Sequence, residues 1–216
     1  FRAGQGTLFY LPQLNLKGGE FIQNRIFLEG YYFEWRRLFQ AGKYIKRAGI
    51  VLDIGANIGN HTLFFLKECH VKKVYAFEPV KSTFQILEKN IRLNHLQDYT
   101  VLYNAALGEN RCNAKVIYNH ADAGGNRVEA AGGGYSDTVM YRLDDIRIPE
   151  HIDFIKIDVE GYEEMVLQGA ADTLRRNHPV LMIEIFDENY SRVNTYLYSI
   201  GYRCRIKAEN DYIYTI

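Results

Sequence analysis

The chain has 216 residues, 47% of them hydrophobic and 24% charged, which is the composition of a globular protein with enough length for one domain and a sizeable core. Its 26 Lys plus Arg equal its 26 Asp plus Glu, so these totals give no basic face for non-specific binding of nucleic acid. No apolar run reaches the roughly 18 residues that a membrane-spanning helix needs.

The three cysteines, Cys69, Cys112 and Cys204, are odd in number and far apart. This spacing argues against a disulfide framework and fits no zinc motif. We therefore expect reduced thiols and a cytoplasmic protein. The sequence starts at Phe1 rather than at a methionine, which indicates either a trimmed chain or a piece of a longer polypeptide. The oligomeric state stays open, a homo-oligomer included.

Residues 1–49 are rich in aromatic side chains, and we expect short strands there, followed by a helix over about 32–48. Aromatic residues in such a segment more often pack than bind ligands, but a segment ahead of a strand–helix core is also well placed to act as a lid. We interpret 1–49 as a lid and substrate segment and 50–216 as the core of a single domain. Its basic residues are interpreted as a solvated helix face: Arg36, Arg37, Lys43, Lys46 and Arg47.

From residue 50 onward, short apolar runs alternate with amphipathic stretches. This alternation predicts a parallel sheet covered by helices on both faces. The expected strands are 50–54, 73–77, 99–103, 152–157 and 180–185. The expected helices are 60–69, 80–94, 162–177 and 189–200. The end of the chain predicts a closing hairpin of 202–206 with 212–216.

The alternation breaks between residues 110 and 147. Strand-like runs at 115–118 and 138–141 flank a glycine-rich loop at 121–134. So much glycine indicates a loop that is mobile or tightly turned. It is either a substrate gate or the end of a long hairpin.

The first core strand runs into a glycine-rich turn, Asp-Ile-Gly-Ala-Asn-Ile-Gly at 53–59. Dinucleotide sites use G-x-G-x-x-G, and here Asn57 takes the position of the second glycine; no Gly-Lys-Ser/Thr of a P-loop follows. Glu78 ends the next strand, 25 positions after Asp53, where such folds place the acid that binds the ribose hydroxyls. The pattern favours a nucleoside ligand without phosphates, of which S-adenosylmethionine is the common example.

A second unusual run is Phe-Ile-Lys-Ile-Asp-Val-Glu-Gly at 154–161. Alternation puts Lys156 and Asp158 on one face of a buried strand, and a buried lysine requires a partner. We expect that partner to be Asp158, or Glu184 on the next strand. The pair is either structural or part of a charged network at the carboxyl ends of the strands, where open α/β sheets bind ligands.

Taken in order, these segments resemble the FkbM-type S-adenosylmethionine-dependent methyltransferase family. The resemblance rests on the turn at 53–59, Phe-Glu-Pro at 77–79, Leu-x-x-Asn and Asn-Ala-Ala-Leu-Gly within 87–108, Leu-Asp-Asp at 143–145, Ile-Lys-Ile-Asp-Val-Glu-Gly-x-Glu at 155–163, Gly-Ala at 169–170 and Ile-Glu-Ile at 183–185. It implies a class I methyltransferase fold: a Rossmann-like, mostly parallel α/β sheet of seven strands, helices on both faces and an antiparallel last strand. It also implies O-methylation of a sugar, glycan or secondary metabolite.

The resemblance further implies that the glycine-rich turn cradles the methionine part of S-adenosylmethionine, that Glu78 holds the ribose, and that Asn104 and Ala105 border the adenine. His61, in the first turn after the loop, is interpreted as a cofactor-side residue. The expected cofactor-binding residues are Asp53, Gly55, Ala56, Asn57, Asn60, His61, Glu78, Asn104 and Ala105.

Methyl transfer to a hydroxyl needs a base, for which Asp158, Glu160, Glu184 and His61 are candidates. We expect Asp158 or Glu160 to orient or deprotonate the acceptor, while Lys156 and Glu184 pair and hold that geometry. The expected catalytic residues are thus Asp158, Glu160, Lys156 and Glu184. Such carboxylates are also able to hold Mg²⁺ against a vicinal diol, but they cluster for other reasons, and we assign no metal ligand.

Three alternatives remain: an N-methyltransferase, an NAD-type oxidoreductase, and a non-catalytic binding module on the same fold. The missing second loop glycine disfavours the oxidoreductase. The acceptor, beyond being a small molecule or glycan, is not named by the sequence.

Overall fold

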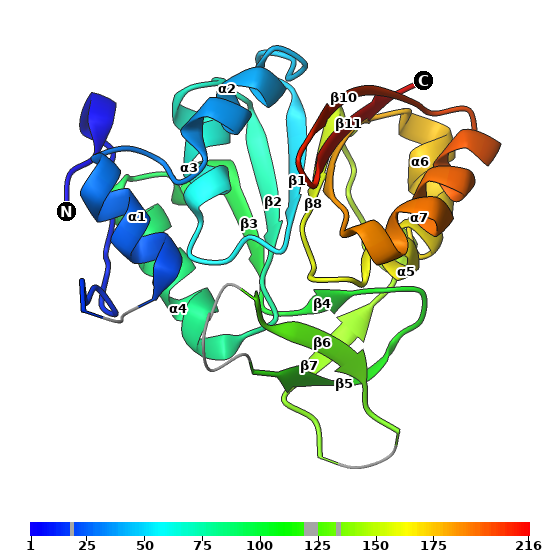
Figure 1. Ribbon diagram of the computed structural model, residues 1–216, viewed down its shortest axis with the longest axis horizontal. Helices are drawn as coiled ribbons and strands as arrows, with labels where there is room; N and C mark the ends of the chain where they lie inside the picture. The colour runs from blue at the N-terminus through cyan, green and yellow to red at the C-terminus, as the bar shows by residue number, and fades with distance from the viewer. Residues whose placement is uncertain (18–19, 119–124, 133–134) are drawn as a thin grey trace.

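The apolar runs from residue 50 onward form one central sheet in a computed structural model that describes residues 1–17, 20–118, 125–132 and 135–216. Its seven strands lie in the order β10-β11-β9-β8-β1-β2-β3 (Figure 1). Five are mutually parallel: β1 (Ile50–Ile54), β2 (Lys73–Phe77), β3 (Thr100–Tyr103), β8 (Phe154–Ile157) and β9 (Val180–Glu184). The last strand, β11 (Asp211–Thr215), pairs antiparallel with both β9 and β10 (Arg203–Ala208). The predicted sheet with an antiparallel last strand is confirmed.

Helices cover both faces of this sheet, as predicted (Figure 1). One face carries α1 (Phe21–Glu29), α2 (Trp35–Gly42), α3 (Asn60–Lys67) and α4 (Lys81–Leu93); the other carries α5 (Glu163–Gln168), α6 (Ala171–Asn177) and α7 (Asp187–Ser199). Neighbouring residues of β1 point to opposite faces: Val51 belongs to the core cluster that includes Phe64, and Leu52 to the cluster that includes Leu197. Among the described residues, none of the helices combines the length and apolar character needed to cross a bilayer.

A second, smaller sheet interrupts the alternation, in the order β4-β7-β5-β6. Its strands are β4 (Ala106–Leu107), β5 (Cys112–Ile117), β6 (Arg127–Ala130) and β7 (Thr138–Tyr141). The two strands predicted around 115–118 and 138–141 are present. The continuous loop predicted over 121–134 is wrong in its middle, because β6 pairs there with β5. Residues 121–124 and 133–134 of that loop lie outside the described residues.

The N-terminal segment, residues 1–49, departs most from the prediction. Its described part has one isolated β-bridge and forms α1 where short strands were expected. The Glu20 carboxylate caps the start of α1, and Gly30 ends the helix in the left-handed region at φ +65°. The helix expected over 32–48 is α2, which is shorter than predicted and ends at Gly42.

Three asparagine side chains, those of Asn60, Asn90 and Asn94, hold the N-terminal segment against the core, and Asn94 does so through both backbone groups of Leu8. Asn60 accepts a hydrogen bond from the Phe33 amide (2.9 Å) and donates one to the Phe33 carbonyl (3.0 Å), and Asn90 accepts one from the Tyr10 amide (2.6 Å). Side chains of the segment also join the core cluster of α3 and α4: Phe9, Ile26, Tyr32 and Leu38. The segment is therefore a packed wall of the same structural unit.

The helix predicted over 162–177 is broken into α5 and α6 at Gly169. The backbone of the residue after β4 approaches closely at this point: a Cβ placed on Gly169 lies 1.9 Å from the carbonyl oxygen of Gly108. The break thus lets the helical layer touch the small sheet, and only a residue without a side chain fits there.

We expect Gly169→Ala to destabilise the fold by about 1–3 kcal/mol, because the new methyl group overlaps backbone atoms that cannot swing aside. The matched control is Gly132→Ala, since a Cβ at Gly132 meets nothing within 4 Å. The free energy of unfolding from urea titrations measures both. Equal stability of the two variants contradicts the packing argument.

Candidate active site

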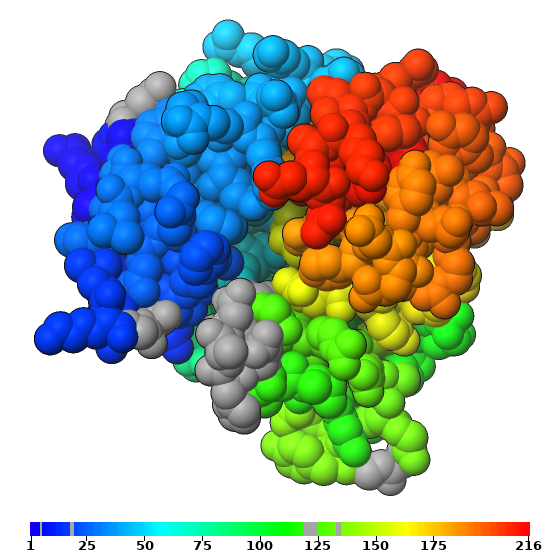
Figure 2. Space-filling model, in the orientation of Figure 1, coloured from blue at the N-terminus to red at the C-terminus, as the bar shows by residue number. Residues whose placement is uncertain are grey.

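Two neighbouring cavities open where β1 and β8 end, beside a hollow that separates the N-terminal segment (blue) from the C-terminal half (orange) in Figure 2. The Glu78 cavity has about 660 Å³ of space and the Glu34 cavity about 690 Å³, in both cases including the open solvent at the mouth. Both share the lining residues Gly55, Asn57, Asp158 and Glu160, so they meet there. The Glu78 cavity adds chiefly Phe77, Glu78, Val80, Ala105, Leu107 and Tyr162; the Glu34 cavity adds Phe21, Ile22, Phe33, Glu34, Ala56, Asn60, His61 and Glu184.

The glycine-rich turn is shaped by close backbone contacts. Gly55 has φ +78°, and a Cβ there lies 1.8 Å from the carbonyl oxygen of Asp158. Asn57 also adopts a left-handed conformation, at φ +50°, which asparagine tolerates better than most residues. The loop therefore runs directly against the end of β8, and its backbone lines both cavities.

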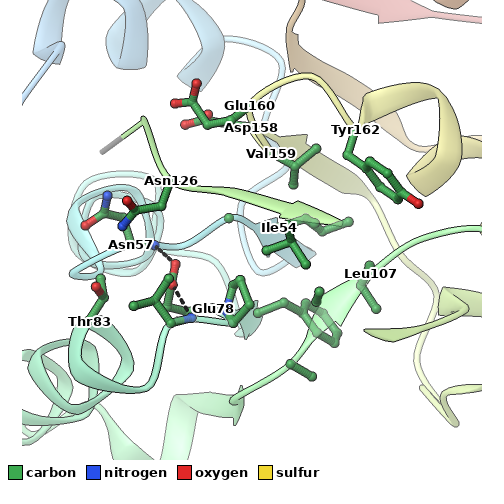
Figure 3. Close-up of a pocket in the computed structure, with 17 residues that line it drawn as sticks. Ile54, Asn57, Glu78, Thr83, Leu107, Asn126, Asp158, Val159, Glu160 and Tyr162 are labelled. Carbon is green, nitrogen blue, oxygen red and sulfur yellow. Dashed lines mark hydrogen bonds between the residues drawn. The ribbon is translucent and has the colours of Figure 1, made fainter. Parts of the chain in front are cut away.

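The carboxylate of Glu78 ties this loop to the end of β2. Its two oxygens accept hydrogen bonds from the Asn57 amide (2.9 Å) and the Val80 amide (2.8 Å), drawn as dashed lines in Figure 3. Burial raises the pKa of Glu78 to about 7, although the two amides lower it. An ionised carboxylate offers about four acceptor positions, so two remain for a ligand in the Glu78 cavity.

Asn104 and Ala105 take different positions. Ala105 lines the Glu78 cavity, whereas the exposed Asn104 is absent from both linings. The Asn104 side chain donates hydrogen bonds to the carbonyls of Glu78 (2.9 Å) and Pro79 (3.1 Å). It thus supports the turn that carries Glu78.

Lys156 is buried beneath the loop, at the centre of the sheet. Its Nζ donates to the Gly55 carbonyl (2.6 Å) and lies 3.2 Å from Asp158 and 3.4 Å from Asp53. Burial alone lowers the pKa of Lys156, but the carboxylates of Asp158 and Asp53 outweigh it and hold that pKa above its usual range. The fully buried Asp53 also accepts a hydrogen bond from the Thr62 hydroxyl (2.5 Å). Lys156 and Asp53 are therefore positioning residues that line neither cavity.

The predicted pairing of Lys156 with Glu184 is wrong, and the alternative partner, Asp158, is correct. Among the described residues, the lysine forms ion pairs with Asp53 and Asp158, because β1 lies between β8 and β2 and brings Asp53 level with Lys156. Glu184 instead hydrogen-bonds to Asp158. Burial and the Asp158 carboxylate raise the pKa of Glu184, so Glu184 holds the proton that the pair shares.

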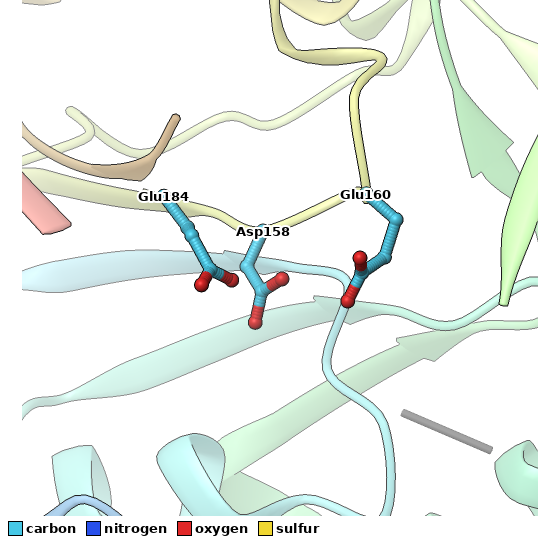
Figure 4. Close-up of side chains that lie close together, drawn as sticks. All are labelled: Asp158, Glu160 and Glu184. Atoms are coloured by element: carbon cyan, nitrogen blue, oxygen red, sulfur yellow. The ribbon is translucent and has the colours of Figure 1, made fainter. Parts of the chain in front are cut away.

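Three carboxyl groups gather at the junction of the cavities, from Asp158, Glu160 and Glu184 (Figure 4). One oxygen of each lies within 4.8 Å of the others. Burial raises the pKa of Asp158, but Lys156 and His61 more than reverse this and leave it lowered. Glu160 occupies the left-handed region at φ +54°, a strained conformation of the kind that concentrates at functional sites.

Asn60 and His61 line the Glu34 cavity from the start of α3. The Asn60 amide group is engaged with the backbone of Phe33. Burial, and secondarily Lys156, lowers the pKa of His61 to about 4, so the imidazole is neutral at pH 7. Its Nε2 atom is buried without a hydrogen-bond partner among the described residues.

A model of the methyltransferase FkbM domain matches residues 53–204, a span that contains the glycine-rich turn, Glu78 and the carboxyl cluster. The chain belongs to the FkbM methyltransferase family. The crystal structure of methyltransferase FkbM from Methylobacillus flagellatus KT is similar to this chain, with a TM-score of 0.60 and 22% identity over 82% of this chain and 46% of that one. This likeness supports the methyltransferase-like α/β fold.

Two further proteins are similar in sequence to this FkbM methyltransferase. Methyltransferase 1 of Beauveria bassiana is 21% identical and matches 87% of this chain and 82% of its own length. The AMB antimetabolite synthetase AmbE of Pseudomonas aeruginosa is 25% identical and matches 81% of this chain, but the matched part is 10% of that protein. The chain thus spans a small part of AmbE and less than half of the Methylobacillus protein.

Sequence reasoning expected residues 1–49 to form a lid and substrate segment, but it did not single out Glu34. Glu34 faces the Glu34 cavity at φ +57°, and burial, then Asp211, raises its pKa to about 7. Arg37, expected on a solvated face, instead pairs with Glu34 (2.6 Å), Asp211 (2.7 Å) and Glu209. The other four basic residues of that cluster are exposed, as predicted: Arg36, Lys43, Lys46 and Arg47. The one sequence feature that pointed to Glu34 is its position as an acid among aromatic residues.

Lys156→Met is expected to destabilise the methyltransferase by about 3–5 kcal/mol, because it leaves Asp53 buried without its cation. Lys46→Met is the control, since that side chain is 73% exposed and its ion pair among the described residues is with Asp153. Urea unfolding followed by circular dichroism compares the two. A loss in the Lys156 variant no larger than in the control shows that the buried lysine is not needed.

Proposed function

We propose that this FkbM methyltransferase transfers a methyl group from S-adenosylmethionine to a hydroxyl group of a sugar, glycan or secondary metabolite. The observation that carries the proposal is the Glu78 carboxylate, which faces a cavity with two acceptor positions left and is held by the same loop that lines it. A vicinal pair of ribose hydroxyls matches such an acceptor.

The residues of the Glu78 cavity fit S-adenosylmethionine. Glu78 is suited to the ribose, and the apolar side chains of Val80, Ala105 and Leu107 are suited to an adenine ring. The glycine-rich turn is suited to the methionine part, because Gly55 and Asn57 border both cavities. When bound, S-adenosylmethionine supplies a methyl group already activated by a positively charged sulfur.

The Glu34 cavity is the proposed place of the acceptor. It combines the apolar side chains of Phe21 and Phe33 with the carboxyl groups of Glu34 and Glu184, a mixture suited to a small polar molecule with an apolar face. Loops on a rigid α/β scaffold commonly carry specificity, and the N-terminal segment contributes the aromatic wall. We infer that residues 1–49 select the acceptor and that the reaction takes place in the cytoplasm.

Asp158 and Glu160 are the proposed catalytic residues, because they border both cavities. The ionised Asp158 accepts a hydrogen bond from the acceptor hydroxyl. This bond orients the hydroxyl so that a lone pair of its oxygen points at the methyl group. Asp158 takes the hydroxyl proton late in the transfer. Lys156 keeps Asp158 ionised and fixes the Gly55 carbonyl, so it acts through its neighbours. Glu184 supports Asp158 from the other side.

Glu78→Ala is expected to weaken S-adenosylmethionine binding by roughly 1.5–3 kcal/mol, because it removes a charged acceptor of the ribose hydroxyls. Glu88→Ala, on the outer face of α4 beside Arg92, is the control and should bind like the parent. Isothermal calorimetry measures both, with NAD as the competing ligand class. Unchanged affinity in Glu78→Ala, or tighter binding of NAD by the parent, contradicts the proposal.

The raised pKa of Glu78, about 7, also predicts how binding depends on pH. The ionised carboxylate is the better acceptor, so cofactor affinity should rise about tenfold between pH 6 and pH 8. Glu78→Ala should lose this rise and keep only any contribution from the cofactor's own amino group. A parent profile that runs parallel to that of the variant contradicts the role of Glu78.

Asp158→Asn and Glu160→Gln should fold, and at least one should lose methyl transfer by about 10²–10⁴-fold, the usual contribution of a positioned base. The acceptor is first found by mass spectrometry of hydroxylated metabolites and glycans incubated with enzyme and cofactor. Single-turnover rates then separate transfer from cofactor binding, which both variants should keep. Near-parental rates in both variants would show that neither carboxylate takes part in methyl transfer.

A further inference from the structure

The carboxyl cluster at the junction of the two cavities has the dimensions of a cation site. Asp158 follows β8, Glu160 lies two residues further on, and Glu184 ends β9, so parallel neighbouring strands bring them to one edge of the sheet. Their carboxyl groups extend to the same side of the strands in Figure 4, and one oxygen from each lies within 4.8 Å of the others. Oxygen ligands at about 2.0–2.1 Å from Mg²⁺ are about 2.9–4.2 Å apart, so small side-chain rotations bring the three into range.

The charges at this cluster are poorly balanced. In the part of the chain that the structure describes, Lys156 pairs with Asp158 of the cluster, and it is shared between Asp158 and Asp53. Glu184 hydrogen-bonds to Asp158 through a shared proton, and a cation between two carboxyl groups is able to replace such a proton. Glu34, another acid, lines the same cavity but is paired with Arg37 at 2.6 Å. Among the described residues, the acids with few cations near them are therefore those of the cluster itself.

His61 provides an observation that is independent of the acids. Its side chain is 7% exposed and lines the same cavity as Asp158, Glu160 and Glu184. Its Nε2 is buried and has no hydrogen-bond partner among the described residues. Buried polar atoms without a partner are rare, and one beside a cavity points to a ligand or to an ordered water that completes it.

We propose that Asp158, Glu160 and Glu184 bind one divalent cation, Mg²⁺ or Mn²⁺, at the junction of the Glu78 and Glu34 cavities. Carboxylate oxygens are the ligands that these hard cations prefer. Three side-chain ligands leave coordination positions open to the Glu34 cavity, where two neighbouring hydroxyls of an acceptor fit. An oxygen bound to such an ion loses its proton more readily. This last role rests on the proposed function, whereas the binding of the ion does not.

The test is a titration of the full chain with Mn²⁺ alone, without S-adenosylmethionine, in which electron paramagnetic resonance counts the free ion. One saturable site per chain is expected, with Mg²⁺ displacing Mn²⁺. Glu184→Gln and Glu160→Gln should each weaken binding at least about tenfold, since even residues that only support metal ligands commonly matter to that extent. Glu88→Gln, an acid on the outer face of α4, should bind like the parent. Metal-free Glu184→Gln should melt no lower than the parent, because it relieves crowding between acids.

Absence of saturable Mn²⁺ binding overturns the proposal, and so does equal affinity in the parent and both cluster variants. Calorimetry of S-adenosylmethionine binding in the presence of a chelator is run on the same samples. If the chain binds the cofactor but not Mn²⁺, the cation site is ruled out and the proposed function stands. If the chain binds Mn²⁺ through these acids but does not bind the cofactor, the cation site stands and the proposed function is ruled out.

Discussion

The site depends on one buried cation. Lys156 reaches across from β8 to Asp53 on β1, to the Gly55 carbonyl in the glycine-rich turn, and to Asp158 at the end of its own strand. Burying an ammonium group is unfavourable unless paired charges and hydrogen bonds replace its water. Two of the groups that replace this water, Gly55 and Asp158, also line both cavities. The contacts that stabilise the buried lysine therefore also fix the shape of the loop.

Around this fixed centre, the molecule gathers an excess of acids from distant parts of the chain. Arg37 joins the N-terminal segment to the C-terminal hairpin by pairing with Glu34, Glu209 and Asp211. Burial is the main cause of the raised pKa of both Glu34 and Asp211, and the positive charge of Arg37 lowers both pKa values in part. The wall of the Glu34 cavity is thus held from both ends of the chain, and an acceptor or ion that enters meets a negative surface.

The sequence predicted the features that are determined locally. A continuous apolar strand needs cover on both faces, so β1 and β8 were placed correctly, and the acid at the end of β2 followed from its spacing after the glycine-rich turn. The turn residues themselves were found because glycine and asparagine tolerate positive φ angles, as Gly55 and Asn57 do.

Features that depend on distant contacts were not predictable in this way. The partner of Lys156 depends on which strands are neighbours, and Asp53 lies 103 residues earlier in the sequence. Strand β6 is mostly exposed and carries little apolar pattern, and its position depends on pairing with β5 and on the packing of Val128. Glu34 joins the site because α1 and α2 pack on α3, which no periodicity in residues 1–49 indicates.

A crystal structure with S-adenosylhomocysteine tests most directly the central claim, that the loop over Lys156 and the Glu78 carboxylate together form a nucleoside site. The account predicts that both ribose hydroxyls hydrogen-bond to Glu78, that the homocysteine part runs along Gly55 and Asn57, and that Lys156 keeps its contact with the Gly55 carbonyl. A ligand bound elsewhere, or a ribose with no contact to Glu78, would contradict it.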